Sequence, residues 1–539
     1  MKAKQAIGLI VGIGAFILAL LIPLEGLSLS GQITLGIFAM AAFFWILEPI
    51  PIYATSMLII LLQVILLSSQ GFVFSPKYAP QVGVVEEVAE GAPAYRVPLE
   101  ALSDSGQIFK VTAKAAKPLS EFEIVSKDAE SVLIRSKSLS ASDRVIEDGD
   151  HRSVATETSS YATFYSTLAS PIIILFLGGF ALAASAVKFG LDKNMTRVLL
   201  KPFGNKPQYV CLGLMICTAI LSAFMSNTAT TAMMMTVVLP IVGGMAMSDP
   251  FRKGVALAIP VAANVGGIAT PIGTPPNAVA LAALKESGIN ISFSSWMLMA
   301  VPFTIILLFI SWRLIMWFFK PNIDRFEVNL DSEFNKSPKA ILSYIVFGAT
   351  ILLWVTEKLH GISTSMVAFI PVAVLPALGV LEKKDIRGFS WEVLWLVGGG
   401  ISMGLSMKDT GLAYWLIELV SWDSFSGLAV IIVFSLVGFA IANLISHTVA
   451  STMLMPLAIT VGTGLAAVGG FNLPAAIVAI TVMVSLAMIL PISTPPNAIA
   501  MSTGVIETKD LAKVGIAVGV AGFIIAIVCA AYVWPHMIG

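Results

Sequence analysis

Polar residues that could bind ions interrupt two of the most apolar parts of this sequence. Ser226-Asn227-Thr228 lies in one apolar stretch, and Thr274-Pro275-Pro276-Asn277 lies in a later one. Unsatisfied polar groups are costly in an apolar environment, so such residues either bond to one another or hold a ligand. Hydroxyl and carbonyl oxygens suit a hard cation such as Na⁺, and the free N–H groups of a helix N-terminus suit an anion. The chemistry indicated is ion binding.

The proline pair predicts a break in a helix. Each proline removes a backbone donor and clashes with the preceding turn, so Thr274-Pro275 should divide a helix into two halves. The same break is expected at Thr494-Pro495. In lipid, backbone that is not helical must line a cavity within the protein. For one isolated motif, contact between helices or a simple kink is an adequate explanation, but several such motifs together favour half of a transport site.

The polar segments occur twice, which indicates an internal repeat. Thr270 to Ala280 reads TPIGTPPNAVA and Leu490 to Ala500 reads LPISTPPNAIA, with eight of eleven positions identical at an offset of 220 residues. The same offset places Ser226-Asn227-Thr228 on Ser446-His447-Thr448. We therefore expect two structurally equivalent halves, with the binding site where the halves meet.

Composition and charge indicate a membrane protein. Of the 539 residues, 57% are apolar and 12% are charged, and apolar runs long enough to span a bilayer recur along the chain. We expect an all-α polytopic protein with about eleven transmembrane helices. Lysine and arginine cluster at residues 2–4, 188–206, 252–253, 313–339, 383–387 and 509–513. The positive-inside rule assigns these clusters and the N-terminus to the cytoplasm. The expected location is a plasma membrane, in a bacterium the inner membrane, and the zero net charge gives no sign of a nucleic-acid partner.

One charged segment differs from the apolar remainder. TSM occurs at Thr55 and at Thr364, an offset of 309, so the first half carries 89 extra residues. Residues 71–165 hold 24 of the 64 charged residues, and alternating stretches within them, such as EFEIVSK, are typical of short strands. We expect a small β-rich extracytoplasmic insertion there. The expected domains are residues 1–70 (three helices, mainly scaffold), 71–165 (the insertion), 166–325 (the rest of the first repeat) and 326–539 (the second repeat).

The orientation of the halves depends on whether the serine-containing segments cross the membrane. Lys206 and Arg252 flank the first such segment, and both belong inside. A re-entrant hairpin satisfies these charges, and so do two complete spans joined by an outside turn. We expect an inverted repeat with two re-entrant hairpins and two broken helices.

With SNTATTAM, GTPPNA and STPPNA in this repeated arrangement, the sequence resembles the divalent anion/sodium symporter family, the INDY-type dicarboxylate transporters. The resemblance covers the membrane portion and leaves out residues 71–165. It implies a homodimer that transports a C4-dicarboxylate such as succinate, malate or fumarate together with Na⁺, by an elevator motion of a transport domain against a scaffold. It implies no enzyme activity and no cofactor, with Na⁺ as the coupling ion.

The resemblance also implies site residues. The first sodium site would comprise Ser222, Ser226, Asn227 and Gly273. The substrate would contact Asn227, Thr228, Thr274, His447, Thr448, Thr494 and Pro495. No Lys or Arg occurs in these motifs, so a dianion would depend on bound cations and helix N-termini for countercharge. That dependence would couple the two ligands.

The second half departs from the first, because Ser222 corresponds to Ala442 and Asn227 to His447. Asn443, Ser446 and Ser493 remain as ligands of a second sodium site. Either a neutral His447 donates to the substrate while Na⁺ binds nearby, or a protonated His447 replaces the cation and makes transport pH-sensitive or sodium-independent. An anion exchanger and a sulfate or phosphate transporter are the alternatives. An extracellular enzyme or receptor has little support, because the sequence contains no nucleophile–base pair.

Overall fold

The structure is a computed structural model with two compact units. It describes residues 3–24, 27, 29–68, 160–325, 334–419, 425–468 and 471–537, together with residue 136 and the strands given below. One unit comprises residues 1–168 and 398–422, and the other comprises residues 169–397 and 423–539. Every residue predicted to bind an ion belongs to the second unit.

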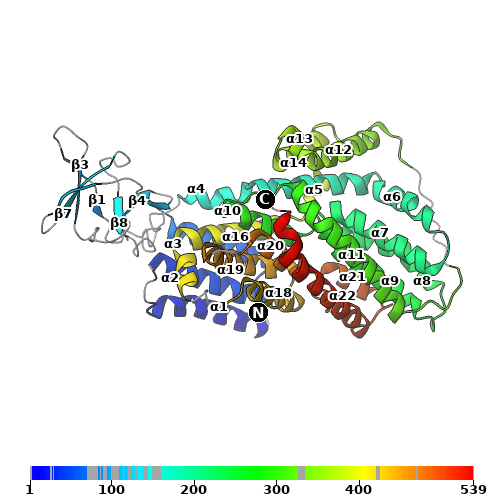
Figure 1. The fold of residues 1–539 in the computed structure, drawn as a ribbon. Coiled ribbons are helices and arrows are strands. Elements are labelled where there is room, and N and C mark those ends of the chain that lie inside the picture. Colours follow the sequence, from blue (N-terminus) through cyan, green and yellow to red (C-terminus); the bar gives the residue numbers. More distant parts are fainter. Residues whose placement is uncertain are drawn as a thin grey trace. The chain divides into compact units, whose positions relative to one another are not determined.

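The first unit combines N-terminal helices with two small sheets (Figure 1). Its helices are α1 (Ala3–Leu21), α2 (Leu29–Leu47), α3 (Ile52–Leu67), α4 (Tyr161–Ser166) and α17 (Leu412–Glu418). One antiparallel sheet has the order β1-β8-β4-β5 and the other has the order β2-β3-β7-β6. The strands are β1 (Gly83–Val84), β2 (Glu86–Val88), β3 (Ala94–Pro98), β4 (Ile108–Thr112), β5 (Ala115–Pro118), β6 (Glu123–Lys127), β7 (Ser131–Arg135) and β8 (Arg144–Glu147).

These strands all fall within the segment expected to be β-rich, residues 71–165. Most other residues of that segment lie outside the described residues. Its boundaries and its side of the membrane therefore stay predictions.

The second unit is built from helices (Figure 1). They are α5 (Pro171–Lys188), α6 (Leu191–Leu200), α7 (Pro207–Phe224), α8 (Asn227–Gly243), α9 (Phe251–Gly267), α10 (Pro275–Glu286), α11 (Phe293–Phe318), α12 (Pro338–Val355), α13 (Glu357–His360), α14 (Thr364–Ala377), α15 (Lys383–Arg387), α18 (Gly427–Leu444), α19 (His447–Val468), α20 (Leu473–Ser485), α21 (Pro495–Ser502) and α22 (Thr508–Val528). Helix α16 (Trp391–Asp409) contributes residues to both units.

Many of these helices are long and apolar enough to lie in a bilayer. Within the described part of the chain, eight helices have the length and hydropathy of a membrane span, and five shorter apolar helices accompany them. The prediction of an all-α polytopic membrane protein is confirmed. The number of eleven spans, the inverted orientation and the re-entrant hairpins stay predictions, because helix length and composition do not show where a bilayer lies.

Both proline motifs break a helix as predicted. Helix α9 ends at Gly267 and α10 begins at Pro275, while α20 ends at Ser485 and α21 begins at Pro495. Proline at the first helical position lacks an N–H that would have no intrahelical partner in any case. The residues before the prolines, Thr274 (φ −145°, ψ 144°) and Thr494 (φ −144°, ψ 145°), have the same backbone conformation. The repeat seen in the sequence is therefore a repeat in structure.

The two halves interlock at these breaks. Helix α21, which follows the second break, packs against α8 and α9 of the first half. Helix α10, which follows the first break, packs against α19 and α20 of the second half. Each broken helix therefore meets the helix that follows the serine-containing turn of the other half.

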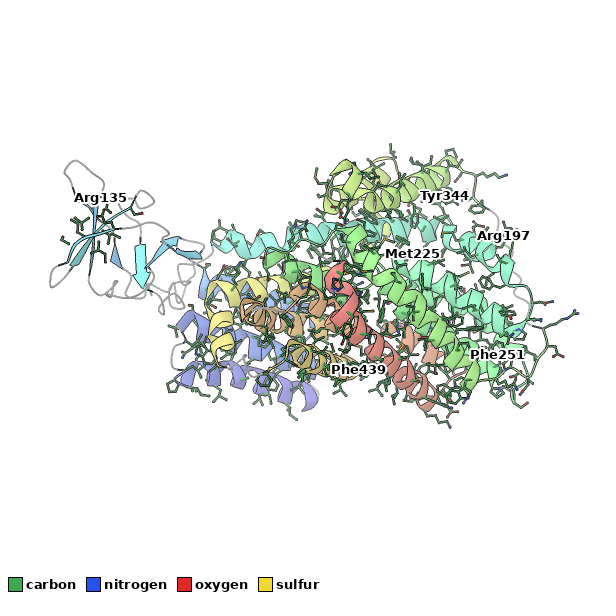
Figure 2. All side chains as sticks on the ribbon, viewed as in Figure 1. Arg135, Arg197, Met225, Phe251, Tyr344 and Phe439 are labelled. Atoms are coloured by element: carbon green, nitrogen blue, oxygen red, sulfur yellow. The ribbon has the colours of Figure 1, made fainter. Side chains whose placement is uncertain are left out.

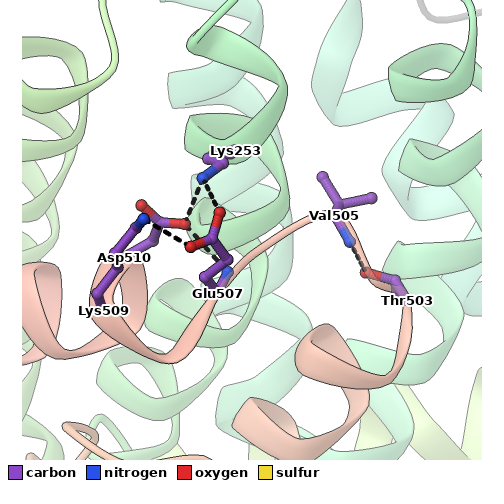
Figure 3. Close-up of polar contacts among 6 residues, drawn as sticks. All are labelled: Lys253, Thr503, Val505, Glu507, Lys509 and Asp510. Carbon is purple, nitrogen blue, oxygen red and sulfur yellow. Dashed lines mark hydrogen bonds and ion pairs between the residues drawn. The ribbon is translucent and has the colours of Figure 1, made fainter. Parts of the chain in front are cut away.

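Ion pairs connect helix ends within the second unit. Glu507 and Asp510 form a capping box at the start of α22, and Lys253 Nζ lies 2.9 Å from Glu507 Oε1 and 2.8 Å from Asp510 Oδ2 (Figure 3). The same arrangement joins α5 to α15, where Lys188 Nζ lies 3.3 Å from Glu382 Oε1 and 2.6 Å from Asp385 Oδ2. The Lys253–Asp510 pair is partly buried, with side-chain exposures of 32% and 11%, and it holds the start of α22 beside the start of α9.

Candidate ion-binding site

The end of α7 and the start of α8 bring three oxygens together. Met225 and Ser226 form the turn between these helices, and Met225 is labelled in Figure 2. Ser222 Oγ lies 2.6 Å from Asn227 Oδ1 and 2.8 Å from the carbonyl oxygen of Ala263 in α9. A serine hydroxyl has one hydrogen and can donate it to one of these acceptors at a time. Three oxygens thus share one hydrogen, an arrangement suited to a hard cation.

Gly267, the last residue of α9, allows the Asn227 side chain to lie against the helix end. A Cβ at Gly267 would lie 2.4 Å from Asn227 Oδ1 and 2.8 Å from Nδ2. Gly273 in turn packs against the carbonyl group of Gly267. A Cβ at Gly273 would lie 2.4 Å from the oxygen of that group. Three of the four predicted first-site ligands, Ser222, Asn227 and Gly273, therefore gather at the C-terminal end of α9. Carbonyl groups at such an end have no intrahelical partner.

Asn277 and Asn497 hold the two breaks in the same way. Asn277 Nδ2 lies within hydrogen-bond distance of the carbonyl oxygens of Gly267, Ile268 and Thr270, at 3.1, 3.3 and 2.8 Å. Asn497 Nδ2 donates to the corresponding carbonyl oxygens of the second half, those of Met488 and Leu490, at 3.0 Å each. Each amide replaces the intrahelical donors that the break removes, so both loops have a defined conformation.

In the second half, protein donors reach the oxygens of the predicted second sodium site. Asn443 Oδ1 accepts from the backbone N–H of Ile489 at 2.8 Å. Ser493 Oγ accepts from the backbone N–H of Leu490 at 3.2 Å and donates to the carbonyl oxygen of Asn443 at 2.9 Å. Asn443 and Ser493 are thus brought together, and a backbone N–H uses one acceptor position on each of the two oxygens.

The serines of the two turns differ in whether they cap the helix that follows. Ser446 Oγ accepts from the backbone N–H of Val449 at 3.3 Å, a normal N-cap for α19. Ser226 makes no such cap at the start of α8. The first-half hydroxyl therefore caps no helix, whereas its second-half counterpart uses one acceptor position for the cap.

His447 occupies the place that Asn227 occupies in the first half. Its Nε2 lies 2.7 Å from the carbonyl oxygen of Ala487, the counterpart of Gly267. A carbonyl oxygen only accepts, so Nε2 carries a hydrogen, and in a neutral ring Nδ1 is then an acceptor. In this geometry a hydrogen bond from His447 to an anion requires the protonated ring.

Asn264 in α9 connects the two halves. Its Nδ2 lies 3.3 Å from Thr494 Oγ1 and 3.4 Å from Asn497 Oδ1. Asn264 is 1% exposed, and its Oδ1 has no hydrogen-bond partner within the described residues. Thr494 Oγ1 also accepts from the backbone N–H of Asn497 at 3.2 Å. The hydroxyl hydrogen of Thr494 therefore remains available to a ligand.

The other predicted substrate residues lie at or next to helix N-termini. Thr228 and Pro495 are exposed, and Thr448 is partly exposed. Thr274 is buried and makes no side-chain cap for α10. Among the residues that the structure describes, the side chains of Thr228 and Thr448 make no hydrogen bond to another motif. Helices α8, α10, α19 and α21 all begin at these motifs, and helix N-termini attract anions.

Sequence reasoning gave no role to three of these residues. Asn277 and Asn497 lie in the TPPN motifs, but their structural role depends on carbonyl groups that the sequence does not place. Asn264 is the single polar residue between Gly254 and Ala269. A polar residue isolated in an apolar membrane segment is a signal of function, and that signal could have identified it.

Within the described ranges, no group of three or more His, Cys, Asp and Glu residues could hold a metal ion. The oxygens gathered at Ser222 and Asn227 are neutral. Neutral oxygens suit an ion that must bind and leave again.

Comparisons with known proteins agree with this chemistry. The family model described as the sodium:sulfate symporter transmembrane region matches residues 150–539. The match begins at residue 150, so the three N-terminal helices lie outside it. The sodium-dependent dicarboxylate transporter SdcS of Staphylococcus saprophyticus is 31% identical over 411 residues, covering 68% of this chain and 77% of that protein. SdcS of Staphylococcus aureus USA300 is 30% identical over 415 residues, covering 69% and 78%.

A solved structure is more distant. Neisseria gonorrhoeae MtrF, described as illuminating a class of antimetabolite efflux pumps, aligns with 89% of this chain and 94% of its own. The TM-score is 0.49 and the sequence identity is 13%. That similarity is too low to support an inference about function.

Proposed function

Because the chain belongs to the sodium:sulfate symporter (divalent anion/sodium symporter) family of transporters, we propose that it is a secondary active transporter that carries a divalent anion into the cell together with Na⁺. The proposed anion is a C4-dicarboxylate such as succinate, malate or fumarate. The relatives from Staphylococcus are named sodium-dependent dicarboxylate transporters. We further propose a homodimer in a plasma membrane, with a cytoplasmic N-terminus and an elevator-type motion.

One observation carries the proposed sodium coupling. Ser222 Oγ, Asn227 Oδ1 and the carbonyl oxygen of Ala263 lie within hydrogen-bond distance and share a single hydroxyl hydrogen. A cation among these oxygens would leave the hydroxyl hydrogen to Ala263 and satisfy the amide oxygen. In this proposal the hydroxyl oxygen of Ser226 and the carbonyl oxygen of Gly273 are further ligands of the cation.

The proposed anion site lies between the helix N-termini. Thr494 retains a hydroxyl hydrogen for donation, and the N–H groups at the starts of α8, α10, α19 and α21 are further donors. Asn227, Thr228, Thr274, His447, Thr448 and Pro495 complete the proposed contacts. Because these motifs contain no Lys or Arg, one bound Na⁺ would lower the electrostatic cost of holding a dianion.

We do not propose the second half as an equal sodium site. Asn443, Ser446 and Ser493 each have an oxygen that accepts a hydrogen from the backbone. Each backbone N–H uses one of the two acceptor positions of its oxygen and leaves fewer for a cation, and Ala442, the counterpart of Ser222, supplies no hydroxyl. The proposal is therefore a principal sodium site at the first half and a weaker one at Asn443, Ser446 and Ser493 in the second half.

A thermal-shift screen of the purified protein tests this function. Succinate, malate, citrate, sulfate and phosphate are each added in NaCl and in KCl of equal ionic strength, and the melting temperature is recorded. A ligand that binds only the folded state stabilises it by RT ln(1 + [L]/Kd), so at a fixed concentration the tighter ligand raises the melting temperature more. We expect the largest shift with succinate or malate, and a larger shift in NaCl than in KCl.

The variant Asn227→Ala sharpens the test, because Asn227 would contact both ligands. It should weaken sodium binding and anion binding together. Loss of one without the other would argue against a shared site. A shift with succinate that is equal in KCl and NaCl would instead support the sodium-independent exchanger, and a shift with sulfate or phosphate alone would replace the substrate class.

A further inference from the structure

Asn264 occupies a position at which the two repeats differ. Its counterpart 220 residues later is Val484, which cannot donate a hydrogen bond. Asn264 Nδ2 reaches Thr494 Oγ1 and Asn497 Oδ1. In the opposite direction, Asn277 Oδ1, the counterpart of Asn497 Oδ1, is buried without a hydrogen-bond partner in the described part of the chain. Within the described residues, a side chain of the first half therefore reaches the break of the second half, but the equivalent contact from the second half to the first is missing.

This link begins beside the proposed sodium site. Ala263, whose carbonyl oxygen lies 2.8 Å from Ser222 Oγ, directly precedes Asn264. The contacts run from Asn227 Oδ1 through Ser222 to the backbone at Ala263, and from the Asn264 side chain to Thr494. A cation held by Asn227 Oδ1 and Ser222 Oγ would leave the serine hydrogen on the Ala263 carbonyl. That hydrogen bond would then hold this segment of α9 in place.

At its other end the link orients a hydroxyl group. Thr494 Oγ1 accepts from Asn264 Nδ2 at 3.3 Å and from the backbone N–H of Asn497 at 3.2 Å. With both acceptor positions used, the hydroxyl hydrogen has a restricted direction. Thr274, the first-half counterpart of Thr494, makes no side-chain cap at the start of α10. Of these two threonines, Thr494 is the one whose hydroxyl oxygen accepts from both a side-chain amide and a backbone N–H.

We propose that Asn264 is a positioning residue that transmits sodium occupancy in the first half to the anion-binding loop of the second half. The inference rests on the proposed function and adds the route of coupling. Asn264 itself need not touch either ligand. Its action is to keep Thr494 and Asn497 fixed relative to the end of α9, so that a sodium-ordered α9 presents an ordered hydroxyl to the anion.

Asn264→Val tests the proposal, because valine is the residue that the fold already accepts at position 484. The probe is succinate, titrated in NaCl and in KCl of equal ionic strength while the melting temperature is measured. The ratio of the two apparent dissociation constants is the coupling factor. One neutral hydrogen-bond link is worth about a fivefold effect, so we expect Asn264→Val to lower this factor about fivefold. Sodium alone, added without succinate, should still raise the melting temperature as in the wild type.

Two further variants keep the test decisive. Val484→Asn makes the reciprocal change in the other half and should leave the coupling factor at the wild-type value. Asn264→Ser replaces Asn264→Val if the latter does not fold, because its shorter side chain also lacks the reach of the amide. If the hydrogen bonds of Asn264 only stabilise the fold, their loss would lower every melting temperature but leave the coupling factor unchanged.

The outcomes separate this inference from the proposed function. If wild type is stabilised by succinate more strongly in NaCl and Asn264→Val shows the same coupling factor, the inference is wrong and the function stands. If Asn264→Val weakens sodium binding and succinate binding to the same extent, the residue supports the site as a whole and the inference is also wrong. If wild type shows no sodium-dependent succinate shift, the proposed function fails and the inference fails with it.

Discussion

Gly267→Ala places one methyl group against the amide that we assign to the sodium site. The added Cβ would lie 2.4 Å from Asn227 Oδ1, so the amide must retreat by about 1 Å to reach ordinary contact. At that displacement the 2.6 Å contact between Asn227 Oδ1 and Ser222 Oγ is lost. Overpacking costs about 1–2 kcal/mol. The hydrogen bond to Ser222 is not counted, because a bound cation replaces it. If that cost falls on the sodium-bound geometry, it corresponds to a rise of about five- to thirtyfold in the sodium concentration for half-saturation.

Sodium titration of the melting temperature, with and without succinate, measures this effect. Gly243→Ala is the matched control, since it lies at the end of the same helix as Asn227, α8, and its Cβ would meet no atom within 4 Å. The control should keep the wild-type sodium dependence. Gly267→Ala should shift it to higher concentration and weaken succinate binding at fixed sodium. A folded Gly267→Ala protein with unchanged sodium dependence would refute the assignment of Asn227 as a ligand.

Other predictions follow from the same contacts. Ser222→Ala removes the shared hydroxyl, and we expect about a tenfold weaker sodium affinity in the same titration; unchanged affinity would exclude Ser222 as a ligand. His447→Leu leaves the Ala487 carbonyl without its donor at a cost of about 1–3 kcal/mol, so the melting temperature should fall, and His447→Gln should restore part of it by donating from its own amide. Hydrogen bonds from Lys509 and Lys253 lower the pKa of Glu507 to about 2. Because the folded-state pKa is depressed, this contribution to stability is present above the ordinary carboxyl pKa near 4.5 and is lost as the pH falls from there toward 2. The melting temperature of wild type should therefore fall more steeply over that range than that of Glu507→Gln, and parallel curves would contradict the ion pair.

The repeat was the most reliable guide that the sequence offered. An offset of 220 residues predicted two helix breaks, and the backbone angles of Thr274 and Thr494 agree within one degree. The prediction succeeded because proline acts locally, so its effect on a helix does not depend on distant packing. The all-α membrane class followed from composition for a similar reason.

The roles of individual polar atoms could not be read from the repeat. At the level of residue types, Asn443, Ser446 and Ser493 looked like a weakened copy of the first sodium site. Their difference is that backbone hydrogens reach the second-half oxygens. Whether a backbone N–H points at an oxygen depends on loop conformation, which similar sequences can share only in part.

The role of Asn264 could not be predicted from the repeat for a related reason. A repeat is recognised by the positions at which its copies match, whereas Asn264 and Val484 differ. Its partners Thr494 and Asn497 come from the other half and are brought close by the packing of α21 against α9. Long-range packing between halves is the part of a fold that a local pattern does not encode.

Uptake of radioactive sodium into proteoliposomes is the most direct test of the central claim, that one first-half oxygen cluster binds Na⁺ as part of anion transport. We predict that succinate outside the vesicles stimulates sodium uptake by wild type, and that Ser222→Ala loses most of this stimulation. Succinate uptake without any accompanying sodium uptake would contradict the account.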